Sequence, residues 1–252
     1  MPSVPIVRAR KPSLPPLVLF DLDDTLFDHT LTLRASLAAL RRDHPFLRAQ
    51  PLESMSEQYA QLLWDTHGEV ALGRRSHAEA RADRFARLAA WAGRAVEPEF
   101  ATQLSTEYRS HYQRLRRPVS GAPEFVTSLA GRTRVGVVTN NTLTEQREKL
   151  AFLGLDRIVD HLVTSDEVGV QKPDVGLFRA ALDRARVRPE EAVMVGDSWE
   201  MDVTGAHASG IRAVWFNRFR EPAPGTPAVL EFSSFRANRK LERMLAGGPG
   251  PP

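Results

Sequence analysis

The chain has 252 residues, 42% hydrophobic and 26% charged, and contains no cysteine, which allows a sizeable folded core and excludes disulfides, thiolate metal sites and cysteine nucleophiles. Its 34 basic residues, 30 of them arginine, nearly cancel against 31 acidic ones. Because there is no continuous basic stripe and no apolar run that could span a membrane, we expect neither nucleic acid nor membrane as a partner, and the lack of cysteine fits a cytoplasmic location.

The two ends of the chain are rich in proline or glycine. Residues 1–16 contain five prolines and no apolar stretch of the kind found in a signal peptide, and residues 246–252 consist of alanine, glycine and proline alone. We predict that both segments are disordered.

Four short apolar runs predict strands that are buried on both faces. They cover residues 17–20, 135–138, 192–195 and 211–216. Helical patterns follow the second and third runs, over residues 144–153, 174–186 and 199–209. Strands that alternate with helices predict an α/β fold, here a Rossmann-like, doubly wound parallel sheet. The core would comprise residues 17–28 and 119–245.

A long segment without a convincing strand, residues 29–118, separates the first two runs. Ser76 and Glu79 form a capping-box pattern before an amphipathic helix, and residues 54–64 and 98–115 have similar helical periodicity. We therefore predict an all-helical insertion. Its fourteen arginines outnumber its ten acidic residues, which favours an anionic ligand between insertion and core.

Large side chains in this insertion have two interpretations. Trp64, Trp91 and Tyr108 fit the core of the insertion better than a platform for substrate. His29, at the start of the insertion, is a candidate to line the crevice, whereas the other histidines show no ligand spacing and are expected to be surface or packing residues.

Polar residues follow the predicted strands at the points where each strand ends. They are Asp21 and Asp23 after the first strand, Thr139 and Asn140 after the second, Lys172 before the helix at 174, and Asp197 and Asp202 after the third strand. Because ligands of parallel sheets bind beyond the carboxyl ends of the strands, we expect these side chains to converge on one site.

Several acids in one crevice need a compensating cation. Two carboxylates about 4 Å apart repel by roughly 4 kcal/mol at an effective dielectric of 20. Oxygen ligands without cysteine or clustered histidine indicate Mg²⁺ rather than zinc. A carboxylate can also act as nucleophile at phosphorus, and a lysine and a hydroxyl are suitable donors to phosphoryl oxygens.

In sequence order these residues resemble the four motifs of the haloacid dehalogenase superfamily of phosphohydrolases. The matching segments are Asp21-Leu22-Asp23-Asp24-Thr25, Thr139-Asn140, Lys172-Pro173-Asp174, and Gly196-Asp197-Ser198 through Asp202. The resemblance covers residues 17–28 and 119–217, and the helical insertion is similar to the cap that one branch of the superfamily carries. Val175 departs from the proline that often follows the third motif.

The resemblance implies a role for each residue. Asp21 would attack phosphorus, and Asp23 would protonate the leaving alcohol and then activate water. Mg²⁺ would be held by Asp21, Asp197 and the main-chain carbonyl of Asp23.

Phosphate would be bound by Thr139, Asn140 and Lys172. Asp202 would orient its neighbours or ligate the metal. Dehalogenases of the superfamily lack an acid at the position of Asp23, so its presence disfavours dehalogenation.

Each motif also has a purely structural interpretation. Residues 21–25 could be a turn after a strand with acids facing water. Thr139 and Asn140 could cap a helix, Lys172 could be a surface lysine, and Asp202 could pair within its own helix. The ordered set favours a phosphatase, with a nucleotide, flavin mononucleotide or a sugar phosphate as candidate substrates. The same aspartate would serve a phosphotransferase or phosphomutase, and a non-catalytic or nucleic-acid-binding protein is the remaining alternative. Nothing in residues 29–118 selects a substrate, and the sequence does not indicate the oligomeric state.

Overall fold

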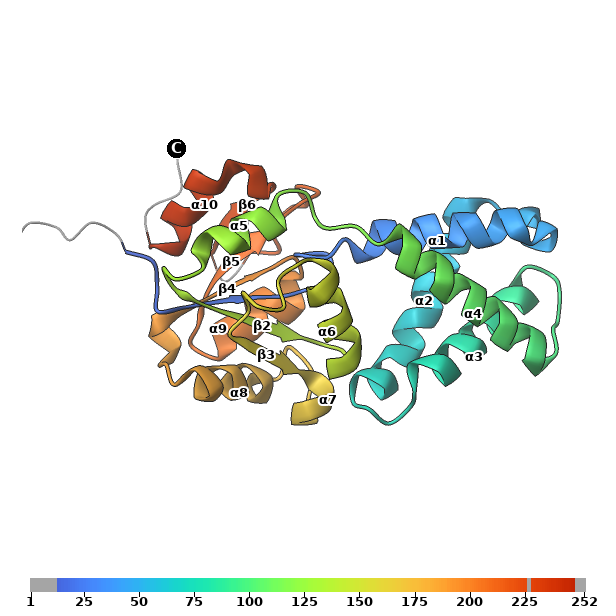
Figure 1. The fold of residues 1–252 in the computed structure, drawn as a ribbon, viewed down its shortest axis with the longest axis horizontal. Helices are drawn as coiled ribbons and strands as arrows, with labels where there is room; N and C mark the ends of the chain where they lie inside the picture. Colours follow the sequence, from blue (N-terminus) through green and yellow to red (C-terminus); the bar gives the residue numbers. More distant parts are fainter. Residues whose placement is uncertain (1–12, 226–227, 248–252) are drawn as a thin grey trace, which may run out of the picture.

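A six-stranded sheet lies at the centre of the larger part of the molecule (Figure 1). The computed structural model describes residues 13–225 and 228–247. All neighbouring strands are parallel, in the order β3-β2-β1-β4-β5-β6. The strands are β1 (Leu17–Phe20), β2 (Arg134–Thr139), β3 (His161–Thr164), β4 (Ala192–Gly196), β5 (Arg212–Phe216) and β6 (Leu230–Phe232).

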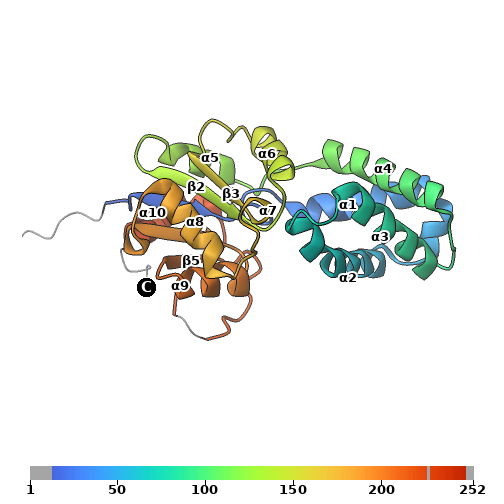
Figure 2. The ribbon, with the colours of Figure 1, turned by 90° about the horizontal axis from the view of Figure 1, so that it is seen from below.

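Helices cover both faces of the sheet, because its central strands carry apolar side chains on both sides. In β1, Val18 and Phe20 belong to one hydrophobic cluster, whereas Leu17 and Leu19 belong to the other. The first cluster includes side chains from α5 (Ala122–Leu129), α6 (Leu143–Phe152) and α10 (Asn238–Leu245), and the second from α8 (Val175–Ala185) and α9 (Gly205–Ala208). The predicted doubly wound α/β core is thereby confirmed (Figures 1 and 2).

Four helices between β1 and β2 form a separate layer beyond the sheet, at the right of Figure 1. They are α1 (His29–Asp43), α2 (Leu52–Ala71), α3 (His77–Trp91) and α4 (Pro98–Leu115), and we call them the cap. An aromatic cluster of Tyr59, Phe85 and Tyr108, with ring centroids 5.2–5.3 Å apart, holds α2, α3 and α4 together. The predicted capping box of Ser76 and Glu79 begins α3.

Two chain segments connect the cap to the core side by side. The main-chain N–H of Asp28 donates to Arg117 O at 3.1 Å, and that of Val119 donates to Leu26 O at 2.9 Å. Within the described ranges, no helix combines the length and apolarity needed to cross a membrane.

The sequence missed the shortest elements and simplified one helix. Strand β3 has only two apolar residues in succession and β6 has Glu231 between its two apolar residues, so neither contains a continuous apolar run. Residues 199–209, predicted as one helix, form a π-helical turn, Trp199–Thr204, followed by α9. The remaining short elements are α7 (Ser165–Val168) and the 3₁₀ turns Pro45–Ala49, Pro189–Glu191 and Phe235–Ala237.

Most of the two segments predicted to be disordered, residues 1–12 and 248–252, lies outside the described residues. Next to the first segment, the carbonyls of Pro15 and Pro16 accept hydrogen bonds from Thr133 Oγ1 and Arg134 N, at 2.5 and 3.2 Å. These two contacts join the last residues of the proline-rich segment to the start of β2.

Candidate active site

The candidate site lies where three adjacent strands, β2, β1 and β4, end at the same edge of the sheet. The chain leaves β1 at Asp21, whose N–H donates to Val195 O on β4 at 2.9 Å. Because β2 and β3 lie on one side of β1 and β4 to β6 on the other, the connections diverge here and open a crevice beyond the strand ends.

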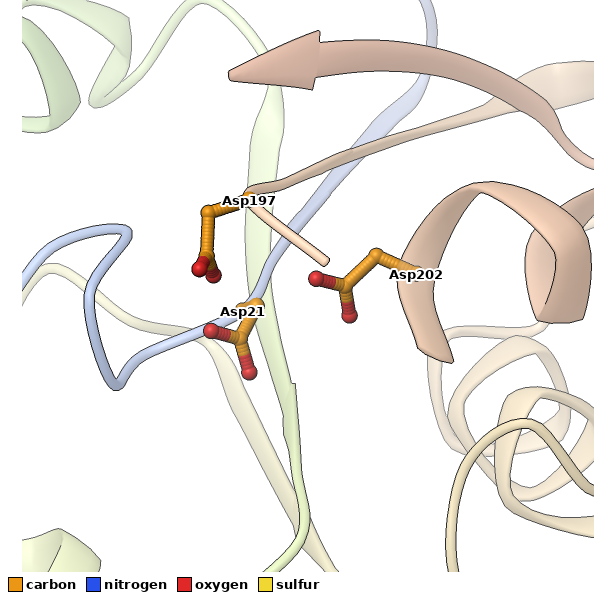
Figure 3. A group of neighbouring side chains, drawn as sticks. All are labelled: Asp21, Asp197 and Asp202. Carbon is orange, nitrogen blue, oxygen red and sulfur yellow. The ribbon is translucent and has the colours of Figure 1, made fainter. Parts of the chain in front are cut away.

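Three carboxylates converge in this crevice. Asp21, Asp197 and Asp202 each offer one oxygen, and these three atoms lie within 4.8 Å of one another (Figure 3). Burial, reinforced by the neighbouring Asp202, raises the pKa of Asp21 to about 7 even though Lys172 opposes the shift. Burial and the charges of Asp21 and Asp202 raise the pKa of Asp197 well above its usual range.

This donor set fits a small divalent cation. Asp21 and Asp197 supply hard oxygen ligands, and a positive charge beside them would relieve the repulsion among the three carboxylates. Carboxylates that bind a metal ion must lose their protons, so a metal site without its ion can hold buried carboxyl groups with raised pKa values.

Lys172 is the cation that the chain itself places among these acids. Its Nζ donates to Asp21 Oδ1 at 2.6 Å and to Asp202 Oδ1 at 2.7 Å. Burial alone would lower the pKa of Lys172, but the two carboxylates outweigh it and raise that pKa above its usual value. Lys172 is therefore charged and is held beside Asp21, the predicted nucleophile.

Asp202 is fixed by the loop that precedes it. Its second oxygen, Oδ2, accepts from the main-chain N–H of Ser198 at 3.0 Å, and the side chain is only 1% exposed. A Cβ on Gly196 would lie 2.2 Å from that oxygen, so glycine is required there for Asp202 to reach Lys172.

Asp197 is held by contacts with two other strand ends. Thr25 Oγ1 donates to Asp197 Oδ1 and accepts from the main-chain N–H of Asp197, both at 3.0 Å. Trp215 Nε1 donates to the carbonyl of Asp197 at 2.7 Å. The threonine of the first motif therefore positions the aspartate of the fourth.

Asp23 has different surroundings from Asp21. Lys149 Nζ lies 2.7 Å from both of its carboxylate oxygens, and Gln146 Nε2 donates to Oδ2 at 3.1 Å. Burial alone would raise the pKa of Asp23, but Lys149, with a contribution from His29, lowers it to about 2. Both partners lie on the buried side of α6.

Gln146 also connects Asp23 to the second motif. Its Nε2 lies 2.6 Å from Thr139 Oγ1, while its Oε1 is buried without a hydrogen-bond partner among the described residues. The side chain of Asn140 connects the second motif to the third, because its Nδ2 donates to Lys172 O at 3.0 Å and its Oδ1 accepts from Lys172 N at 2.7 Å.

A cavity of about 660 Å³ lies between the strand ends and the cap. Core residues Asp21, Asp23, Thr139, Asn140, Lys172, Asp197 and Asp202 all line it, so the structure brings every sequence-predicted site residue to one cavity. The cap contributes polar and aromatic side chains from three helices: Trp64, His67, His77, Arg81, Arg84 and Arg109.

Direct contacts join the cap to the core around this cavity. Arg109 on α4 pairs with Glu145 and Glu148 on α6, at 2.8 and 2.6 Å. At the start of the same helix, His77 Nε2 lies 3.0 Å from Thr142 Oγ1. The cavity is consequently bounded by cap and core together.

Some expectations for the cap were right and others wrong. His29 lines the cavity, as expected, and Tyr108 is buried among the cap helices, where it also borders the cavity. Trp64 was expected in the core of the cap, but its side chain is 66% exposed and borders the cavity. His67 and His77 also line the cavity and are not merely surface or packing residues.

Gln146 and Lys149 are site residues that no sequence motif marks. They lie three residues apart on a helix whose apolar pattern is weak. The one sequence feature that could indicate a role in the site is that both are polar and lie on the buried side of that helix. That signal becomes visible only when the direction of the buried side is known.

Comparisons with known proteins agree with this architecture. Residues 15–210 match the family of haloacid dehalogenase-like hydrolases. The chain is 36% identical over 229 residues to a phosphoserine phosphatase of Thermus thermophilus, an alignment that covers 82% of this chain and 90% of the relative.

It is also 35% identical over 215 residues to a ribulose-1,5-bisphosphate 5-phosphatase of Halopiger xanaduensis, covering 81% and 85% of the two chains. Among solved structures, the magnesium-bound HAD-hydrolase YfnB of Bacillus subtilis has the same fold. Its TM-score is 0.73 at 23% identity, over 92% of this chain and 99% of that one.

Proposed function

The chain belongs to the haloacid dehalogenase-like hydrolases and is a phosphoric monoester hydrolase, and on that premise we propose that it is a magnesium-dependent phosphatase of a small phosphorylated metabolite. The observation that carries the proposal is the convergence of Asp21, Asp197 and Asp202 on one point beside Lys172. Such a cluster of carboxylates suits a reaction in which a bound cation offsets the negative charges of both the carboxylates and the phosphate group.

In the proposed reaction, Asp21 supplies the nucleophile. One of its carboxylate oxygens attacks phosphorus, the bond from phosphorus to the ester oxygen breaks, and an aspartyl-phosphate forms. Asp23 gives a proton to the departing alcohol and then takes one from the water that hydrolyses the aspartyl-phosphate. Asp23 also argues for an ester substrate, because a halide leaving group needs no proton.

Other residues hold the phosphoryl group and the cation. We assign phosphate binding to Lys172 and Thr139, and we assign to Asn140 the additional task of fixing the main chain of Lys172. Asp21, Asp197 and the carbonyl of Asp23 would hold Mg²⁺, which when bound offsets the negative charge of phosphate and nucleophile. We propose that Asp202 orients Lys172, since both of its oxygens are engaged by Lys172 and Ser198.

The substrate is proposed to be a small metabolite that fits a cavity of about 660 Å³. Phosphoserine and ribulose 1,5-bisphosphate are the first candidates, from the names of the relatives. A nucleotide, flavin mononucleotide and sugar phosphates complete the panel.

The test is release of inorganic phosphate from this panel, measured with Mg²⁺ and with a chelator. We expect turnover of at least one compound with Mg²⁺ and none with the chelator. One phosphate released per substrate consumed indicates a hydrolase, whereas substrate loss without free phosphate would indicate transfer to a second hydroxyl.

Asp21→Asn tests the nucleophile. Turnover should fall at least about a thousandfold, because an amide cannot form the aspartyl-phosphate. Asp183→Asn, which removes an exposed carboxylate on α8, is the matched control and should keep full activity. Near-full activity of Asp21→Asn with every substrate would refute the assignment.

A further inference from the structure

Two arginines of α3 point to a second charged group on the substrate. Arg81 and Arg84 are three residues apart, so they share one side of the helix, and both line the cavity. We call them the arginine pair. Arg84 is only 4% exposed and Arg81 is half-buried.

The arginine pair has no acidic partner among the described residues. Arg84 Nε donates to Ala80 O at 3.1 Å, and its guanidinium carbon lies 5.6 Å from the centroid of the Tyr59 ring. Among the described residues, neither its two terminal nitrogens nor the Arg81 guanidinium makes a hydrogen bond, and none of these nitrogens is a fully buried atom without a partner, so they remain accessible from the cavity that both residues line.

The acids near the arginine pair are engaged by other groups. Three carboxylates that line the cavity pair with other cations: Asp65 with Arg87, Glu145 with Arg109, and Asp23 with Lys149. On α3 itself, Glu79 caps the helix, and Asp83 lies near Arg75 and Arg87.

A positive charge is therefore left uncompensated on the cap side of the cavity. Burial, together with the neighbouring Arg109 and Arg84, lowers the pKa of Arg81 below its usual value. Partial burial weakens the hydration of these cations, and guanidinium groups bind carboxylate and phosphate oxygens through paired hydrogen bonds. An anion between the two arginines would offset this loss of hydration.

That anion is distinct from the phosphate that is cleaved. The reacting phosphate is assigned to the strand ends, beside Asp21 and Lys172, whereas the arginine pair lies on the cap. We propose that the substrate is a phosphomonoester that carries a second anionic group, a carboxylate or another phosphate, and that Arg81 and Arg84 bind this second group. The inference rests on the proposed phosphatase function and narrows its substrate class.

Matched pairs of substrates test the proposal and separate the two sources of the anion. O-phosphoserine is compared with O-phosphoethanolamine, which lacks only the carboxylate. Ribulose 1,5-bisphosphate is compared with ribulose 5-phosphate, which lacks the second phosphate. For each pair, kcat/KM is measured for the wild-type enzyme with Mg²⁺. We expect a preference of about tenfold or more for the doubly anionic member in one pair.

Arg81→Gln is the principal variant, since removing this guanidinium breaks no hydrogen bond to the described residues. It should lower the preference ratio about tenfold, and Arg81→Lys should restore part of it. Arg74→Gln removes an exposed arginine near the start of the same helix that does not line the cavity, and it should leave the ratio unchanged.

Three results would overturn the proposal. Wild-type enzyme that does not distinguish the members of either pair lacks a second-anion site, although it remains a phosphatase. A variant Arg81→Gln that slows both members equally shows that Arg81 does not recognise the second anion. Absence of phosphate release from every compound, including the wider panel, refutes the phosphatase function together with this inference.

Discussion

Asp21 and Asp23 are two residues apart, but their surroundings shift their pKa values in opposite directions. Burial raises the pKa of Asp21 to about 7, whereas Lys149 outweighs burial and lowers that of Asp23 to about 2. The proposed roles require the reverse order, an ionised Asp21 and a protonated Asp23, so we expect bound Mg²⁺ to lower the pKa of Asp21 and the negative charge of the substrate phosphate to raise that of Asp23. The sequence identified both aspartates, but the difference between their pKa values comes from burial and from Lys149, which is 126 residues from Asp23.

Replacing Lys149 tests how Asp23 is held. Lys149→Met leaves a carboxylate without its ion pair, and the pKa of Asp23 should rise toward the value that burial favours. We expect a loss of unfolding free energy of up to about 3 kcal/mol, the lower end for breaking a buried pair. In kinetics, kcat should fall about tenfold because Asp23 is no longer positioned.

Urea unfolding at pH 7 and initial rates of phosphate release measure the two effects. Arg147→Met is the matched control, since it removes an exposed cation from the same helix and should change neither quantity. Equal behaviour of the two variants would show that Lys149 does not position Asp23.

The glycine at the end of β4 offers a second test at this scale. In Gly196→Ala the new methyl group would lie 2.2 Å from Asp202 Oδ2, so Asp202 must move away from Lys172. We expect kcat/KM to fall about tenfold or more as Lys172 loses its orientation. The double variant with Asp202→Ala should be no worse than the poorer single variant, and additive losses would contradict a shared cause.

For whole elements, the sequence predicts the bounds of helices better than the direction in which their side chains face. The predicted helix 144–153 agrees with α6 to within one residue at each end. The direction in which Gln146 faces depends on where the helix packs against the sheet, which sequence periodicity does not give. Trp64 was misplaced for the same reason, since an aromatic residue on an amphipathic helix fits either a core or a cavity wall.

The ion pairs between α4 and α6 provide a test of how the cap is held on the core. Arg109→Gln removes both contacts of Arg109 with Glu145 and Glu148. Because these groups are partly exposed, the free energy of unfolding should fall by only about 1 kcal/mol or less. The value of KM should rise about threefold or more, since the closed arrangement around the substrate is weakened.

Arg87→Gln serves as the control for this variant. Arg87 is paired within the cap, with Asp65 and Asp83, and makes no contact with the core. Thermal unfolding and substrate-saturation curves should show a similar small change in stability for both variants but a change in KM only for Arg109→Gln. Equal KM values would mean that the α4–α6 contact is not needed for substrate binding.

For the whole molecule, the positions of polar residues after successive predicted strands were enough to predict that they meet in one site. Parallel strands end at one edge, so polar residues placed after successive strands meet there however far apart they are in sequence. The same reasoning cannot be applied to the cap, because helices in an insertion have no common edge. Its contribution to the cavity, including Arg81 and Arg84, required the structure.

The acidic cluster also predicts how stability depends on pH and metal. The pKa of Asp21 is about 7 in the folded protein and 3.8 is its ordinary value, so between these values the folded state holds a proton that the unfolded state has lost. The contribution of Asp21 to the unfolding free energy of the metal-free protein is therefore fully present below pH 3.8. It decreases as the pH rises to about 7. The raised pKa of Asp197 acts in the same direction.

A divalent cation should reverse this loss, because it replaces the missing protons. Below pH 7 the ion must displace the proton of Asp21, so its stabilising effect should be small at pH 5.5 and larger at pH 8. Thermal unfolding midpoints measured at both pH values, with Mg²⁺ and with a chelator at equal ionic strength, give the comparison. Asp197→Asn, which loses one proposed ligand, should reduce the Mg²⁺-dependent rise at pH 8. An equal rise at both pH values would place Mg²⁺ binding elsewhere than at these carboxylates.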